Sequence, residues 1–427
     1  MSMENATVAE NLTTGAAWLI GLGTAMPTAG NATDTHQQPS LEPAANQCAG
    51  FSPEDVLDLR EDELTAASYL MKDSLKGLML PVLYAVLAVA TLGNLAFFVV
   101  LARVPHMRNT TNLFLANLAA ADIAFVVISV ACYQIYFSHP VRSHYGTARA
   151  LGCVGAFGGQ YVTYYASLAI VTLVSAERYS SICRPLRHRS VNTRRRAVRL
   201  LAGSWVLAFA LTGVVMLRYT RLDLRCLLWP ETERYRGLPV LIGYCLPSQP
   251  WGLLLANLTE SVPFVAAFVA NVCMYVGIIR TLSNRTALQE SCKEGKEGAS
   301  LSQRATRVRR QVAKMLMATG VVFFLCNTPF VAISVSFIVS HLRGLPMLEI
   351  YESMAGLLVI SHGMLFLNSA ANPIIYNATS SHYREAFRDA FCCADTSGRP
   401  RLDSSTVAAV SGSKRTPVEE KYTVTKV

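Results

Sequence analysis

Charged residues are scarce in this sequence. Asp, Glu, Lys and Arg make up 15% of its 427 residues and hydrophobic residues 52%, whereas soluble domains usually contain about 25% charged residues. Three long stretches contain no charge at all: Leu78–Ala102, Leu200–Leu217 and Met315–Ser340. They also lack the polar face, repeated at helical period, that a helix of a soluble protein would show. This shortage of charge argues against a large soluble helical protein.

Apolar stretches long enough to cross a bilayer recur along the chain, since a helix needs about 20 apolar residues to do so. Four further stretches carry only one or two charges. The sequence therefore predicts an all-α membrane protein, a bundle of seven transmembrane helices. A transporter is not favoured, because the paired repeats typical of that class are not seen. The four stretches are Leu113–Phe137 with Asp122, Ala150–Ile182 with Glu177 and Arg178, Trp251–Ile279 with Glu260, and Tyr351–Tyr376 with Glu352.

The basic residues predict how these helices are oriented. If the first helix runs inward, 26 of the 38 Lys and Arg residues lie on the inner side, and 16 of the 28 Asp and Glu residues lie on the outer side. Inner loops of membrane proteins carry such an excess of Lys and Arg. We therefore expect an extracellular N terminus, a cytoplasmic C terminus and a plasma-membrane location. The net charge of +10 reflects this topology, so a nucleic-acid partner is not expected.

Four regions follow from this topology. They are an extracellular arm at 1–77, the helical bundle at 78–379, a short amphipathic eighth helix on the membrane surface at 380–393, and a disordered cytoplasmic tail at 394–427. The arm carries glycosylation sequons at Asn5, Asn11 and Asn31. Its acidic segment Phe51–Leu75 is expected to form a loose amphipathic helix.

The eighth helix is predicted from an aromatic stripe. Tyr383, Phe387 and Phe391 follow one another at four-residue intervals, so they share one face of a helix that can lie on the inner leaflet. Cys392 and Cys393 follow directly and are candidates for palmitoylation.

Polar residues inside the predicted spans are candidates for function, because their burial in lipid is costly. A carboxylate among amides and hydroxyls can hold a small hard cation such as sodium, with Asp122 as the metal ligand. The same groups can instead form hydrogen bonds between helices, and the sequence leaves both interpretations open. The residues are Asn94, Asp122, Ser167, Asn368, Ser369 and Asn372.

Two motifs lie near the inner ends of spans. In Glu177–Tyr179 an acid stands beside Arg178, where it can hold the arginine and release it when helices move. An arginine that merely reaches the lipid surface is the simpler alternative. The second motif, Asn372–Tyr376, contains a proline that frees a backbone carbonyl, so a kink or unwound turn is expected. Pro263 and Pro329 predict the same in two other spans.

Taken in order, these residues resemble the motifs of the rhodopsin-like G-protein-coupled receptors, one for each helix. The resemblance extends from about Leu78 to Cys393. It implies a cell-surface receptor that activates a heterotrimeric G protein and has no enzymatic activity. The matching residues are Gly93-Asn94, Asn117-Leu118 with Asp122, Cys153, Glu177-Arg178-Tyr179, Trp205, Pro263, Phe323 with Cys326 and Pro329, and Asn372-Pro373-Ile-Ile-Tyr376.

The resemblance also implies roles for the matching residues. Arg178 would insert toward the G protein on activation, and Leu186 would dock into it. Asp122 would anchor an allosteric sodium ion, and no cofactor is otherwise implied. The coupling residues are Glu177, Arg178, Tyr179, Leu186 and Tyr376.

A disulfide is implied between Cys153 and the second outer loop, which offers Cys226 and Cys245. The family's bridging cysteine usually lies in the second strand of a hairpin, which favours Cys245. Cys226 remains an alternative, and the cysteine left over can pair with Cys48. The strands predicted here are Arg218–Trp229 and Leu238–Leu246.

Two residues depart from the family's pattern. Asn327 stands in place of the tryptophan at the floor of the pocket, and Asn271 in place of a tyrosine two turns after Pro263. Both positions belong to the family's activation relay, so an orphan or constitutively active receptor is the alternative to a ligand-gated one. Asn327 can also extend the polar network toward Ser167 and Asn368.

Residues of the third span indicate which class of ligand is expected. Amine receptors carry an aspartate where this chain has Gln160, and opsins a lysine where it has Phe366. The long outer hairpin and Gln160-Tyr161 look most like the neuropeptide branch that includes thyrotropin-releasing-hormone, ghrelin, neuromedin and neurotensin receptors. A peptide ligand is therefore expected. The candidate pocket residues are Gln160, Tyr161, Tyr164, Glu260, Phe330 and His362.

Glu260 allows two interpretations. As a buried carboxylate it needs a partner, which a structural hydrogen bond to Thr259 or to a neighbouring helix would provide. It can instead pair with a basic group of the ligand, while Gln160 takes amide groups.

Further partners are expected on the inner side. Arrestin and receptor kinases would act through the Ser/Thr-rich tail. A PDZ domain could bind Thr425–Val427, because a hydroxyl residue stands two before the terminal valine. Membrane lipid surrounds the bundle.

Overall fold

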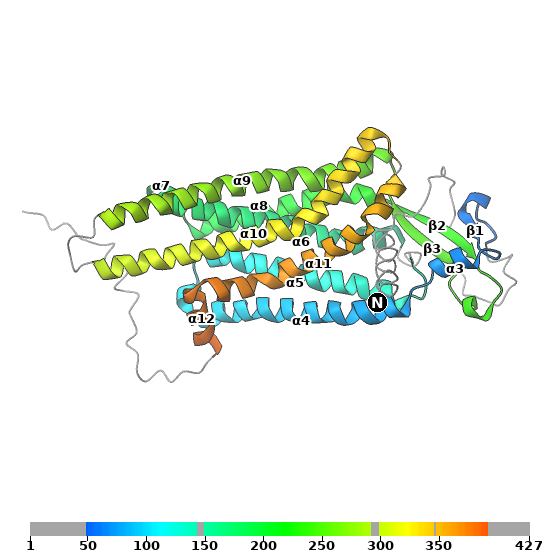
Figure 1. The fold of residues 1–427 in the computed structure, drawn as a ribbon, viewed down its shortest axis with the longest axis horizontal. Coiled ribbons are helices and arrows are strands. Elements are labelled where there is room, and N and C mark those ends of the chain that lie inside the picture. The colour runs from blue at the N-terminus through cyan, green and yellow to red at the C-terminus, as the bar shows by residue number, and fades with distance from the viewer. Residues whose placement is uncertain (1–47, 143–148, 292–298, 346, 392–427) are drawn as a thin grey trace, which may run out of the picture. The chain divides into compact units, whose positions relative to one another are not determined.

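The computed structural model describes residues 48–142, 149–291, 299–345 and 347–391. Long helices dominate this part of the chain, and Figure 1 shows them lying side by side. They are α4 (Asp73–Arg103), α5 (Thr110–Ser138), α6 (Arg149–Cys183), α8 (Arg194–Val215), α9 (Pro250–Ser291), α10 (Ala299–Arg343) and α11 (Met347–Thr379).

The predicted apolar stretches lie within these helices, apart from the end of Leu200–Leu217, which continues from α8 into the 3-10 helix η3 (Met216–Tyr219). Among the described residues, five helices are long and apolar enough to cross a membrane. They are Lys76–Arg103, Thr110–Ser138, Arg194–Tyr219, Trp251–Asn284 and Arg310–Arg343. The prolines Pro263, Pro329 and Pro373 lie inside continuous helices.

Local sequence explains where several helices begin. The side chain of Asn109 accepts a hydrogen bond from the backbone N–H of Asn112 at 3.0 Å and starts α5. Thr193 caps α8 in the same way, because an N-cap oxygen satisfies an N–H that the helix leaves free. Short helices follow α6 and α11, namely α7 (Pro185–Val191) and α12 (Ser381–Phe391). We call the end of the bundle that carries α7 and α12 the α7 end.

A small sheet lies at the opposite end of the bundle (Figure 1), which we call the sheet end. Strand β2 (Arg221–Leu228) pairs antiparallel with β3 (Leu241–Leu246) and parallel with β1 (Val56–Asp58). The predicted hairpin therefore forms, with shorter strands than expected. The connection between β2 and β3 contains the 3-10 helix η4 (Glu233–Tyr235) and Gly237, whose φ of 75° favours glycine.

The segment Phe51–Leu75 was expected to be an amphipathic helix, and this prediction was wrong. It forms the 3-10 helix η1 (Pro53–Asp55), β1, the short helix α3 (Glu63–Ser68) and the start of α4. Pairing with β2 supplies backbone partners that local periodicity cannot reveal. The reason for the error is therefore a contact between distant parts of the sequence.

The arm and the hairpin share one apolar cluster, which we call the outer module. The indole N–H of Trp229 donates to the carbonyl of Pro239 at 3.1 Å, and its ring stacks on Tyr235 with centroids 5.6 Å apart. A disulfide between Cys48 and Cys226 joins the two segments. The buried residues of the cluster are Leu59, Ala66, Tyr69, Val141, Leu227, Trp229, Tyr235, Ile242 and Tyr244.

The Cys48–Cys226 disulfide should stabilise the outer module. It links residues 178 positions apart, so its loss should cost about 2–5 kcal/mol of stability. We expect Cys48→Ser and Cys226→Ser to lower the unfolding temperature of the purified protein equally, and the double variant to be no worse than either. Tryptophan fluorescence during thermal unfolding measures this. Cys273→Ser, which removes an exposed free cysteine, is the control and should change nothing. Clearly additive effects would contradict the prediction.

Candidate functional site

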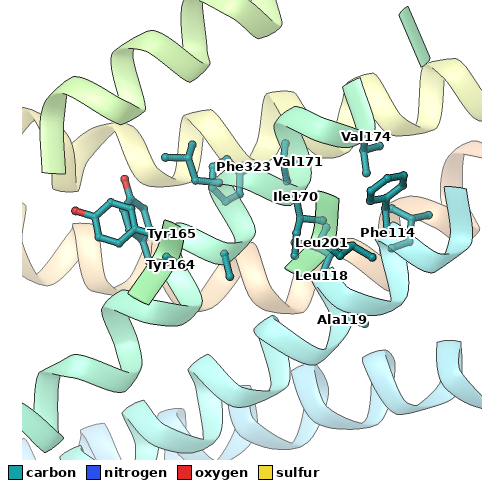
Figure 2. Packing of buried hydrophobic residues seen from close by; sticks show 14 of the residues in the cluster. Phe114, Leu118, Ala119, Tyr164, Tyr165, Ile170, Val171, Val174, Leu201 and Phe323 are labelled. Atoms are coloured by element: carbon teal, nitrogen blue, oxygen red, sulfur yellow. The ribbon is translucent and has the colours of Figure 1, made fainter. Parts of the chain in front are cut away.

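Helix α6 connects the candidate sites at the two ends of the bundle. It packs against α5, α8, α9 and α10. Figure 2 shows Val174 of α6 beside Phe114 of α5, and Tyr164 and Tyr165 farther along α6 toward the sheet end. Because α6 is surrounded by other helices, many of its polar side chains are buried, and buried polar groups are usually hydrogen-bonded inside the protein.

At the sheet end, Glu260 of α9 is the centre of a buried polar network. Its side chain is 1% exposed. The Tyr161 hydroxyl donates to its Oε1 at 2.7 Å, the Arg218 guanidinium lies 2.9 Å from the same oxygen, and the Ser334 hydroxyl donates to Oε2. The network therefore joins α6, η3, α9 and α10.

Arg218 also has hydrogen-bond partners besides Glu260. Its Nη2 donates to Oδ1 of Asn257 at 2.7 Å, and its Nη1 donates to the Tyr161 hydroxyl at 3.3 Å. Removing two charges from water is costly unless they pair closely and their remaining hydrogen-bonding capacity is used. Both members of the pair have such partners, while Nε of Arg218 has none among the described residues.

The structure gives Glu260 partners within the protein. Its partners lie on neighbouring elements, as the structural alternative expected, but Thr259 is not one of them, because the Thr259 hydroxyl donates to the carbonyl of Leu255. Arg218, Asn257 and Ser334 were not predicted to belong to this network. Arg218 was expected in a strand, whereas η3 continues α8 and keeps the arginine at the bundle. The sequence feature that could have predicted the place of Arg218 is its position directly after an uncharged span.

The other candidate pocket residues form two groups. Tyr164 and Phe330 pack beside the Glu260 network, since the Phe330 ring centroid lies 6.3 Å from that of Tyr161 and 6.0 Å from that of Tyr164. Gln160 and His362 lie elsewhere, beside Cys132 and Tyr133 of α5. The Gln160 side chain contacts Cys132. The ring of His362 meets that of Tyr133 edge-on, with centroids 6.4 Å apart.

A second polar cluster lies inside the bundle. The amide of Asn372 donates to Oδ2 of Asp122 at 2.7 Å, and the amide of Asn94 donates to the carbonyl of Ser369 at 3.0 Å. The Ser369 side chain also contacts Asp122. The structure therefore brings together four residues of the predicted cation site, from α4, α5 and α11.

The remaining predicted members do not enter this cluster through any hydrogen bond among the described residues. The amide of Asn327 donates at 2.6 Å to the carbonyl of Phe323 in its own helix. The described residues show no hydrogen bond from Asn327 to Ser167 or Asn368. The side-chain amide of Asn271 donates a hydrogen bond to the hydroxyl of Thr172 in α6 at 3.1 Å. Side-chain amides can satisfy helix carbonyls locally, which sequence position alone does not reveal.

At the α7 end, Glu177 holds Arg178. Nε of Arg178 lies 2.9 Å from Oε2 of Glu177. The Thr111 hydroxyl donates to the same oxygen at 3.2 Å, and Nε2 of His188 lies 3.9 Å from Oε1. A groove of about 150 Å³ between α5, α6, α7 and α8 opens beside this pair. The arginine is thus restrained next to a hollow surface.

The other predicted coupling residues lie at the same end. Tyr376 is buried, and its ring contacts those of Phe97 and Tyr383 with centroids 5.5 and 5.6 Å away. Leu186 in α7 is 83% exposed. Tyr179 lies under the guanidinium of Arg184, 5.9 Å from the ring centroid. A buried anchor and an exposed apolar side chain therefore flank the Glu177–Arg178 pair.

Two disulfides lie at the sheet end. Cys153 near the start of α6 is joined to Cys245 in β3, with Cα atoms 5.7 Å apart, which is the pairing favoured from the resemblance. Cys226 is joined to Cys48 instead. The predicted modification sites Asn5, Asn11, Asn31, Cys392 and Cys393 lie outside the described residues.

A further arginine is buried at the sheet end, beyond α5. Arg142 is 2% exposed, and its backbone N–H donates to the carbonyl of Tyr69 at 2.8 Å. Burial lowers the pKa of its guanidinium, and the nearby Tyr136 opposes this shift. Within the described residues, its Nε and Nη2 atoms have no hydrogen-bond partner.

The comparisons with known proteins agree with this geometry. The family model described as "7 transmembrane receptor (rhodopsin family)" matches residues 93–376. A neuromedin U receptor homolog of Caenorhabditis elegans is 30% identical over 329 residues, which cover 69% of this chain and 74% of the relative. Neuromedin-U receptor 1 of Homo sapiens is 29% identical over 80% of this chain and 79% of its own length. Galanin receptor 2a of Danio rerio is 26% identical over 72% and 76%.

Breaking the Arg218–Glu260 pair on one side should be more harmful than removing it altogether. Arg218→Met leaves a buried carboxylate without its cation and should destabilise the protein by about 3–5 kcal/mol, whereas Arg218→Met/Glu260→Met should regain most of that loss. Thermal unfolding and surface expression measure both.

The control is Arg221→Met, because Arg221 is 38% exposed and pairs with Asp223. Its loss should cost about 0–1 kcal/mol. If the double variant is as unstable as the sum of its single variants, the pair is not a coupled unit.

Proposed function

The chain belongs to the rhodopsin family of seven-transmembrane receptors, and we propose that it is a plasma-membrane receptor for an extracellular neuropeptide or peptide hormone and activates a heterotrimeric G protein. Members of this family are receptors and not enzymes. The observation that carries the proposal is the arrangement of α6. One helix holds Tyr161 in the polar network at the sheet end and Arg178 in its ion pair at the α7 end. Ligand contacts at one end can therefore bias the other.

The proposed topology places the sheet end outside the cell. The helices α6 and α11 would cross the membrane together with the five long apolar helices, and α12 would lie on its inner surface. Two observations support this orientation. Both disulfides are at the sheet end, and disulfides persist in oxidising compartments. Basic residues are concentrated around α7, including Arg184, Arg187 and Arg194, as expected for the cytoplasmic side.

Peptide binding is proposed at the sheet end. Relatives named for neuromedin U and galanin support a peptide as the ligand. Because Arg218 already neutralises Glu260, a basic ligand group would have to compete with an internal cation. Tyr164 adds a buried hydroxyl that has no hydrogen-bond partner among the described residues.

Coupling is proposed at the α7 end. When helices separate there, Arg178 would leave Glu177 and become available to the G protein, while the exposed side chain of Leu186 would insert into an apolar pocket of that partner. Tyr376 would move from its place beside Phe97 and Tyr383. An ion pair at the surface of a crevice suits this purpose, because a partner can replace its interactions.

An allosteric sodium ion is part of the proposal, and the residues present fit it. Asp122 is 1% exposed, and the buried Oδ1 of Asn94 has no hydrogen-bond partner among the described residues. A cation would compensate the charge of the Asp122 carboxylate and use this oxygen. The family suggests no other bound group.

Further partners are proposed through segments outside the described residues. Arrestin and receptor kinases would bind the cytoplasmic tail, and a PDZ domain would bind Thr425–Val427. A constitutively active receptor remains the second candidate function. The Asn327 amide bonds within α10, and the Asn271 amide bonds to α6. These two asparagines stand in place of residues of the family's usual activation relay.

A ligand screen tests the proposed function. We expect at least one peptide from a library of amidated neuropeptides to raise calcium or change cyclic-nucleotide levels in cells expressing this receptor, with a saturable concentration response. Untransfected cells are the control. High signalling without any peptide, unchanged by the whole library, would favour the constitutive receptor instead.

Arg178 should be required for that response. Arg178→Ala removes the side chain proposed to enter the G-protein interface, so we expect signalling to be abolished while surface expression is largely kept. Arg199→Ala, which removes an exposed arginine from α8, is the matched control and should signal normally. Undiminished signalling by Arg178→Ala would remove the role proposed for this residue.

A further inference from the structure

Tyr275 of α9 lies between α6 and α10 near the α7 end. Its hydroxyl is 2.8 Å from Oγ of Ser175 in α6. Oγ of Ser175 also lies 3.1 Å from the carbonyl of Val171, to which it can donate, and either hydroxyl can be the donor between Tyr275 and Ser175. Tyr275 therefore ties α9 to α6 three residues before Arg178.

Only a glycine on α10 leaves room for this tyrosine. A Cβ atom added at Gly320 would lie 2.9 Å from Cζ of Tyr275 and would clash with its hydroxyl. The end of the phenol ring is thus seated on the backbone of α10. Any side chain at position 320 would push the hydroxyl away from Ser175.

A second tyrosine packs against a glycine in the same way, between α6 and α9. A Cβ atom at Gly277 of α9 would lie 2.7 Å from Cε2 of Tyr179 in α6. The two tyrosines therefore connect α6 to α9 and α9 to α10 in series. Ile182, Ile278 and Ala313 form a buried apolar cluster against which both rings pack.

We propose that Tyr275, seated on Gly320 and bonded to Ser175, is a positioning residue for G-protein coupling that holds α10 against α6 while Arg178 is paired with Glu177. The proposal rests on the proposed function. Separation of α10 from α6 would expose the Tyr275 ring and remove its contact with Gly320. The hydrogen bond to Ser175 and the packing on Gly320 therefore both favour the arrangement in which α10 lies against α6. Tyr275 acts through the helices and needs no contact with the G protein.

The hydroxyl is tested by measuring basal G-protein activation per surface receptor without ligand. Tyr275→Phe and Ser175→Ala each remove one partner of the bond, so each should raise basal activation by about two- to tenfold, the range for loss of one hydrogen bond. The double variant should match either single variant. A merely structural bond would lower expression and leave activation per receptor unchanged.

The seat is tested separately. Gly320→Ala should raise basal activation because it displaces the ring. Tyr275→Leu removes the atoms that clash, so Gly320→Ala/Tyr275→Leu should equal Tyr275→Leu alone. Gly203→Ala is the matched control, because a Cβ atom there meets nothing within 4 Å, and it should have no effect.

A distance measurement separates this proposal from the proposed function. Spin labels on the exposed positions Val198 of α8 and Lys314 of α10 report helix separation by pulsed electron resonance without any G protein. Tyr275→Phe and Gly320→Ala should both shift the distribution to longer distances. If distances shift but no variant signals, the proposed function fails and the positioning role stands. Unchanged distances and unchanged basal activation in both variants would overturn the positioning role.

Discussion

Burying a charged or polar side chain in the apolar bundle is costly unless another part of the protein supplies a partner. The packing of this molecule follows from that constraint at its charged groups. Glu260 is buried with Arg218, Tyr161 and Ser334 around it. These partners come from different elements and can meet only if α6, η3, α9 and α10 pack in one register. The ion pair is therefore less a source of net stability than a condition that selects this packing.

The same constraint acts at three depths of the bundle. At the sheet end it produces the network around Glu260. In the interior it produces the hydrogen bond of Asn372 to Asp122, and at the α7 end it produces the ion pair of Glu177 with Arg178. The first two sites join groups from different helices, which only the folded bundle can bring together, whereas Glu177 and Arg178 are adjacent in the sequence. A change that rearranges one helix alters the partners at more than one site, which is a physical basis for communication along α6.

The outer module gives the segment Phe51–Leu75 a defined place beside the hairpin, where a loose amphipathic helix was expected. Strand β1 extends the β2–β3 hairpin, and the disulfides of Cys226 and Cys245 attach that hairpin to the arm and to α6. A peptide approaching the sheet end would therefore meet a preformed surface. Preformed surfaces bind with a smaller loss of conformational entropy, which suits the recognition of a short peptide.

The sequence by itself determined the helical class, because long uncharged stretches such as Met315–Ser340 have few alternatives to a buried or membrane-spanning helix. It also placed Arg178 beside Glu177, since neighbours in a motif remain neighbours in the fold. Tertiary structure alone decided which distant groups meet. Arg218 reaches Glu260, Cys48 reaches Cys226, and Tyr275 reaches Gly320 across separations in sequence that no local period encodes. Hydropathy reports what must be buried, whereas the partner of a buried group depends on helix rotation and packing.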